Sequence, residues 1–241
     1  MYLDLNVQTI SEWPLEHPKE VSDLLQAYNN VSRFEEKAPS WKYLEKPAKT
    51  VGVILEQARW AALTNKSTMP RVLEQAHNTI GNSIIKAARD NFEFYLEQVE
   101  ARFNQAAEPY ADAVAKLPES FEDKDALGFT PEQFEAYQAA KQAAGPLRFV
   151  LSFMKDATDT LRLGNLGEHR SIFLAVQPQD LEQYKAIQFG SRETSSAELA
   201  VFPELRNALA VGATLRLATP SEAAGELARV TSGLAEDLGL E

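Results

Sequence analysis

Glu74 and His77 have the residue types and spacing that a metal site would use. They stand three residues apart in "LEQAHNTIGN", residues 73–82 of the 241-residue chain, so on a helix they share one face. Ferritin-like bundles hold two metal ions with two Glu-x-x-His pairs and two further glutamates. Among the three histidines only His77 has this motif, and a second copy would have to supply the other half. We therefore predict no metal and interpret the pair as polar neighbours of an apolar stripe.

A second cluster falls in "RLGNLGEHRS", residues 162–171, where two glycines accompany Glu168, His169 and Arg170. A histidine beside a carboxylate and an arginine could serve as an acid or base, or could bind an anion. Arg192 precedes a predicted helix start and could contribute to such a site. No nucleophile elbow, Walker loop or dinucleotide fingerprint accompanies these residues. An enzyme or small-anion-binding protein that uses His169, Arg170 and Arg192 is therefore the alternative prediction, not the leading one.

Composition removes several function classes. The 35 acidic and 24 basic residues give a net charge of -11, which disfavours general binding to a nucleic-acid backbone. The absence of cysteine excludes disulfides, thiolate metal sites and cysteine nucleophiles, and we predict no cofactor. The start of the chain lacks the pattern of a secretory signal and no run of 18 apolar residues occurs. We expect a cytoplasmic protein, or one assembled into a particle in the cytoplasm, with no membrane contact.

Hydrophobic periodicity predicts the elements that would position these side chains. Leu3, Leu5 and Val7 alternate with polar residues, which predicts a strand. Helices are predicted from about 18 to 37 and after Pro47. From Leu73 to Leu117 one apolar residue recurs per turn, and only Pro109 interrupts the stripe.

A second long stripe from Phe134 to Leu161 follows a predicted helix start at Thr130 and Pro131, with a kink expected at Pro146. Two long helices joined by a turn form an antiparallel hairpin, which we place at 68–163.

Short apolar runs at 171–179 and 213–220 predict two late strands. A capping box is predicted at Ser195 and Glu198, and a last helix begins at Pro220. The predicted fold class is α+β and predominantly α-helical, with a long antiparallel helical hairpin projecting from a small mixed sheet-and-helix base. The predicted parts are 1–67 and 164–241, which form the base, and the hairpin at 68–163.

Charge is distributed unevenly along the chain. Residues 33–71 contain eight Lys or Arg and four Asp or Glu, whereas residues 90–144 contain twelve acids and four bases. This polarity suits head-to-tail contacts between copies, although an acidic surface also simply favours solubility.

The leading prediction is a non-enzymatic structural or assembly protein that self-associates, or packs into a larger complex, through a coiled-coil-like helical hairpin. We expect protein partners, including a homo-oligomer, and the architecture is analogous to that of phage-particle (virion) components. A regulator that binds a partner helix is a further alternative. The predicted interface residues are Phe94, Trp60, Glu119, Glu122, Asp123 and Asp125.

Overall fold

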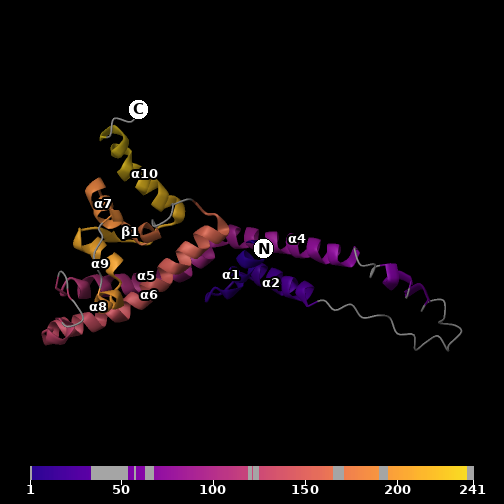
Figure 1. Cartoon of the computed structure of the whole chain (residues 1–241), viewed down its shortest axis with the longest axis horizontal. Coiled ribbons are helices and arrows are strands. Elements are labelled where there is room, and N and C mark those ends of the chain that lie inside the picture. Colours follow the sequence, from indigo (N-terminus) through magenta and orange to yellow (C-terminus); the bar gives the residue numbers. More distant parts are fainter. Residues whose placement is uncertain are drawn as a thin grey trace. The chain divides into compact units, whose positions relative to one another are not determined.

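The computed structural model is predominantly helical with one small sheet, and the predicted fold class is confirmed (Figure 1). The chain divides into two compact units, Met1–Asn91 and Phe92–Glu241. The structure describes residues 2–33, 54–56, 58–62, 68–118, 121, 125–164, 171–189 and 195–237.

The N-terminal unit is built from three helices, α1 (Tyr2–Glu12), α2 (Lys19–Ser32) and α4 (Thr68–Asp90). Both α1 and α2 pack against α4, and residues 54–56 and 58–62 are also helical. Gly81 permits the close approach of α1, because a Cβ atom there would lie 3.2 Å from the side chain of Leu3.

The strand predicted at Leu3, Leu5 and Val7 is wrong, because these residues lie in α1. Leu3, Val7 and Ile10 recur at helical spacing, and Val7 and Ile10 are buried while Leu5 is 53% exposed. Residues 3 and 7 share a face both in a strand and in a helix, so this short alternation does not distinguish the two. Ile10 is buried together with Val7, three residues earlier, and only a helix places residues at that spacing on one face.

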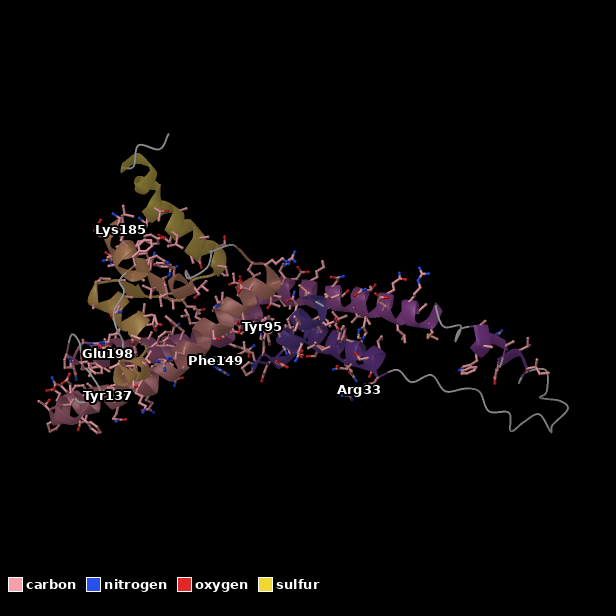
Figure 2. The ribbon with its side chains drawn as sticks, in the orientation of Figure 1. Arg33, Tyr95, Tyr137, Phe149, Lys185 and Glu198 are labelled. Carbon is pink, nitrogen blue, oxygen red and sulfur yellow. The ribbon has the colours of Figure 1, made fainter. Side chains whose placement is uncertain are left out.

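The C-terminal unit is organised around a helix pair, α5 (Phe92–Val114) and α6 (Pro131–Leu161). A short 3-10 helix, η2 (Asp125–Gly128), precedes α6 in the chain. The ring of Tyr95 lies 6.3 Å from that of Phe153, and Arg102 lies over Phe149, so the helices run antiparallel. Figure 2 shows Tyr95 near one end of the pair, Phe149 nearer its middle and Tyr137 toward the other end.

The apolar stripe predicted along α5 is buried, as expected. Both helices continue through their internal prolines, Pro109 and Pro146. Helix α6 begins at the predicted cap, Thr130, and the structure adds a capping box there, since Thr130 accepts from the amide of Gln133 and the Gln133 side chain accepts from the amide of Thr130. The buried stripe residues are Phe92, Tyr95, Val99, Phe103, Ala106, Tyr110, Val114 and Leu117.

The boundary between the units differs from the predicted start of the hairpin at residue 68. Helix α4 belongs to the N-terminal unit, and a turn at Asn91 separates it from α5. The amide nitrogen and the side-chain Nδ2 of Asn91 both donate to the carbonyl oxygen of Ala87, at 3.0 and 2.8 Å. These bonds satisfy a carbonyl at the end of α4, where the intrahelical donors run out.

The remaining elements of this unit lie on one side of the α5–α6 pair (Figure 1). The two strands pair antiparallel, with Val176 opposite Leu215 and Gln177 opposite Thr214. Both fall within the late strands predicted from the sequence, but the sheet has two antiparallel strands and not the three of the predicted mixed sheet. In chain order the elements are η3 (Ser171–Leu174), β1 (Val176–Gln177), α7 (Leu181–Phe189), α8 (Ser196–Ala200), α9 (Pro203–Ala210), β2 (Thr214–Leu215) and α10 (Pro220–Asp237).

Candidate functional site

The residues of the predicted anion site, His169, Arg170 and Arg192, lie outside the described residues. Three of the predicted interface residues, Glu119, Glu122 and Asp123, also lie outside them.

The other predicted interface residues are described. Phe94 is 38% exposed although its ring meets the edge of Tyr95 at 6.0 Å. Asp125 is exposed, and Trp60 is partly buried. Of the predicted interface residues, Phe94 therefore presents an accessible aromatic ring on α5, and the proposed interface stays a prediction.

His77 takes part in a polar network that connects the three helices of the N-terminal unit. Its Nε2 atom lies 2.7 Å from Oγ of Ser32, and its ring stacks on Tyr28 at 4.3 Å. The hydroxyl of Tyr28 donates to Oδ1 of Asp4 at 2.6 Å. Glu74 is exposed. The imidazole is thus engaged between α2 and α4, and the part of the chain that the structure describes contains no group of three or more His, Asp or Glu side chains suited to a metal ion.

The network shifts two pKa values in opposite directions. The hydroxyl of Tyr28 holds the pKa of Asp4 below its ordinary value, because a hydrogen bond to the carboxylate favours the charged form. Burial, together with the hydrogen bond to Asp4, raises the pKa of Tyr28 to about 12. Both shifts favour the observed ion–hydroxyl pair near neutral pH, so the network joins helices and is not poised for acid–base chemistry.

A groove of about 590 Å³ lies between α5 and α6 in the C-terminal unit. Helix α5 contributes Arg102, Gln105, Ala106 and Pro109 to its lining. Helix α6 contributes Ala139, Gln142, Ala143, Gly145, Pro146 and Phe149. The two internal prolines of the helix pair therefore stand at the same level and line a single groove.

The prolines give this groove an unusual supply of hydrogen-bond acceptors. Proline has no backbone N–H, so Pro109 cannot donate to the carbonyl oxygen of Gln105, and Pro146 cannot donate to that of Gln142. Gln105 and Gln142 line the same groove as the prolines. A proline inside a helix costs about 3 kcal/mol relative to alanine, so the groove is built at a considerable cost in stability.

Among the described residues that line the groove, Arg102 is the one with a charged side chain. Its guanidinium carbon lies 4.8 Å from the centroid of the Phe149 ring, a cation–π contact that fixes its position at one end. Ala106 and Ala143 form a buried floor, whereas Gln105 and Gln142 are exposed. The groove combines a small-residue floor with amide and guanidinium groups, which can donate hydrogen bonds, and with carbonyl groups, which can accept them.

The groove opens on the side of α5 that is turned away from the remaining elements of the unit. Leu96, Glu100 and Asn104 of α5 share a separate cavity with Leu215 of β2 and with Arg216, which follows β2. At 3.6 residues per turn, these positions lie on the opposite side of α5 from those that line the groove. Within the described residues of this unit, the elements from η3 to α10 therefore leave the grooved face of the helix pair open.

A second hollow region surrounds Arg216 and Glu222, which line two cavities of about 210 and 420 Å³. Glu222 accepts from the amide and hydroxyl of Thr219 at 2.8 and 2.9 Å, and these bonds lower its pKa. Nη2 of Arg216 lies 3.8 Å from Glu222. Glu222 thus completes the N-terminal cap of α10, a structural role that accounts for its position.

Sequence reasoning missed Gln105 and Gln142, although a signal was present in the chain. Each stands four residues before a proline inside a long predicted helix, and this is the position whose carbonyl loses its amide donor. The sequence does not indicate that the two positions would meet in one groove, because this depends on how α5 aligns with α6.

These features define a helical-hairpin protein with a small α/β base and an open, polar groove on the hairpin. Searches against protein-family models, curated proteins and solved structures found no match to this chain. Over the described residues, no helix is both long and apolar enough to span a bilayer.

Proposed function

We propose that this chain is a non-enzymatic assembly protein, which self-associates or packs into a larger complex through the α5–α6 pair. The observation that carries the proposal is the groove on the open face of that pair, with its small-residue floor and two carbonyl groups that lack their helical donors. Polar groups of this kind gain most when a partner both covers them and bonds to them. The comparison with repeated particles, phage virions among them, is an analogy of architecture alone.

Surface charge supports association between copies. The described acids of α5 and α6 in the acidic segment, including Glu97, Glu108 and Glu135, are exposed. In the basic segment 33–71, Arg33, Arg59 and Arg71 are also exposed. Opposite charges on two regions of one chain can steer one copy toward the next, and salt weakens such steering.

The absolute mass of the full chain in solution tests the proposal. Light scattering at low and at high salt should show a species heavier than one chain, with a smaller average mass at high salt. Reversing two exposed acids of the hairpin, Glu97→Lys with Glu135→Lys, should lower the mass at low salt. Asp23→Lys, an exposed acid on α2, is the matched control and should leave the mass unchanged. A chain that stays monomeric at every salt concentration, and that no partner binds through α5–α6, would rule the proposal out.

The alternative functions give different results in the same assay. An enzyme or anion-binding protein should lose ligand binding in His169→Ala with Arg170→Ala, or in Arg192→Ala, with no change in assembly. A regulator that binds a partner helix should be monomeric alone and should form a complex of one chain with its partner.

A further inference from the structure

We propose that α8, α9 and the turn between them, residues 195–210, form a strap that opens as one body while the α5–α6 pair stays folded. The structure shows the closed state, in which the strap contacts the fully buried Tyr110 of α5. Opening gives solvent and other molecules access to this part of α5. The inference goes beyond the assembly function, because it concerns a single chain and holds whether or not the chain self-associates.

The turn between α8 and α9 contains a strained residue. Phe202 has a φ of 61° and a ψ of 74°, a left-handed conformation that crowds the Cβ atom against the backbone and that bulky residues rarely adopt. Phe202 is also buried, so the fold holds this conformation with the ring packed. Such strain persists only where the surrounding contacts enforce it. Opening of the strap relieves the strain, so Phe202 lowers the free energy that opening requires.

Side chains of the helix pair bind carbonyl oxygens of the strap around this residue. The hydroxyl of Tyr110 donates to the carbonyl oxygens of Val201 and Phe202 at 2.6 and 3.0 Å. Arg148 of α6 donates to the carbonyl oxygen of Leu199, and its guanidinium carbon lies 5.1 Å from the centroid of the Phe202 ring. Water replaces hydrogen bonds of this kind when they open, so each contributes only modestly to the closed state.

Contacts within the strap favour movement of α8 and α9 together. The buried ion pair of Glu198 and Arg206, with 2.9 Å between Oε1 and Nη1, joins α8 to α9. Glu198 also forms the capping box of α8 with Ser195. Separation of the two helices would break the ion pair, which is costly for charges that are buried. An opening that keeps the pair intact therefore requires less free energy than one that parts α8 from α9.

A cavity of about 270 Å³ lies between the strap and the end of α5. The strap contributes Arg206, Leu209 and Ala210 to its lining. The other side consists of Ala111, Val114, Ala115, Leu117 and Pro118. Atoms that line a cavity have no protein contact on that side, so the dispersion attraction across it is smaller than across a filled interface. Parts of a protein with few buried apolar contacts open at the lowest free energy, and the cavity places such a seam beneath α9.

Hydrogen exchange of the unmodified chain, followed by mass spectrometry of its fragments, tests whether the strap opens by itself. The hydrogen-bonded amides of α9 should exchange at least about tenfold faster than those in the interior of α5 and α6. Equal exchange in α9 and in the helix pair would overturn the proposal, because the strap would then open only when the whole unit unfolds.

A single introduced thiol provides an independent measurement, because the chain contains no cysteine. Ala208 of the strap and Ala140 of α6 are both 0% exposed, so Ala208→Cys and Ala140→Cys form a matched pair. The thiol of Ala208→Cys should react with dithionitrobenzoate at least about tenfold faster than that of Ala140→Cys. Equal rates in the two variants would contradict separate opening of the strap.

Two substitutions of Phe202, each combined with Ala208→Cys, test the role of strain. Phe202→Gly and Phe202→Ala both lose the ring, and only alanine keeps a Cβ atom in the left-handed conformation. The thiol should therefore react about threefold more slowly, or less, in Phe202→Gly than in Phe202→Ala. Asn207→Gly and Asn207→Ala are the control pair, because Asn207 lies within α9 and a right-handed helix favours alanine, so their order should be reversed. Slower reaction in Phe202→Ala than in Phe202→Gly would overturn the strained strap.

Discussion

Arg206 and Glu198 form a buried ion pair, with 2.9 Å between Nη1 and Oε1 and side-chain exposures of 6% and 9%. Arg206 also donates to the carbonyl oxygen of Pro118 and lies 4.7 Å from the centroid of the Phe121 ring. Glu198 completes the cap of α8, where it accepts from the amide of Ser195 at 3.3 Å. The pair therefore connects α8, α9 and the segment that leaves α5, and it fixes the base onto the hairpin.

Removal of one member of this pair should destabilise the C-terminal unit strongly. Glu198→Ala removes the carboxylate that pairs with the buried Arg206 guanidinium, and breaking a buried ion pair by removing one member costs about 3 to 5 kcal/mol. The measurement is urea unfolding followed by circular dichroism. Lys185→Ala, which breaks the exposed pair with Glu182, is the control and should shift the midpoint far less. Equal shifts in the two variants would show that the buried pair has no special role.

Tyr110 is predicted to hold the turn between α8 and α9 against the hairpin. Its buried hydroxyl donates to the carbonyl oxygens of Val201 and Phe202 at 2.6 and 3.0 Å. Tyr110→Phe keeps the ring but leaves two buried acceptors without this donor, which should cost about 1 to 3 kcal/mol in unfolding free energy. Tyr137→Phe removes a longer bond of 3.3 Å to Ala197 and is expected to cost less. A larger loss in Tyr137→Phe would contradict this ranking.

Stability of the N-terminal unit should depend on pH through Tyr28. Its folded pKa is raised from 10.0 to about 12, so its contribution is fully present below pH 10 and is lost as the pH rises through about 12. The pKa of Asp4 is lowered in the folded chain. The contribution of Asp4 to stability is therefore present above its ordinary pKa and is lost as the pH falls through the folded value. Helix content of the wild-type chain and of Tyr28→Phe, measured against pH, should fall less in the variant between pH 10 and 12, and some loss should remain because burial also raises the pKa values of Tyr95 and Tyr110. An unchanged alkaline profile would contradict the role assigned to the hydroxyl.

Long-period patterns in the sequence predicted the structure well, and short ones did not. The stripe along α5 extends over many turns and matches the buried residues from Phe92 to Leu117, because errors at single positions average out. The alternation from Leu3 to Val7 covers too few residues to separate a strand from a helix, and packing against α4 decides the outcome. The helix caps at Thr130 and Ser195 were also predicted from the sequence, because a cap is formed by residues that are close together in the chain.

The candidate site could not be predicted because its parts meet only through tertiary structure. Pro109 and Pro146 were recognisable as positions where a helix loses a backbone donor, but the alignment of α5 with α6 determines that they share a groove. The second role of Glu198, as the partner of Arg206, likewise depends on how α8 packs beside α9. Residue types indicated which groups were available, and the non-local contacts determined which of them came together.

Two glycines should respond to alanine substitution in opposite directions. Gly225 lies exposed within α10, and a Cβ atom there would meet nothing within 4 Å, so Gly225→Ala should stabilise the chain by up to about 1 kcal/mol through higher helix propensity. Gly212 has a φ of 83°, a left-handed conformation that strains a residue with a side chain, so Gly212→Ala should destabilise it by about 1 kcal/mol. Thermal unfolding of both variants tests whether Gly225→Ala stabilises the chain and Gly212→Ala destabilises it. Stabilisation by Gly212→Ala would mean that the turn before β2 does not require the left-handed conformation.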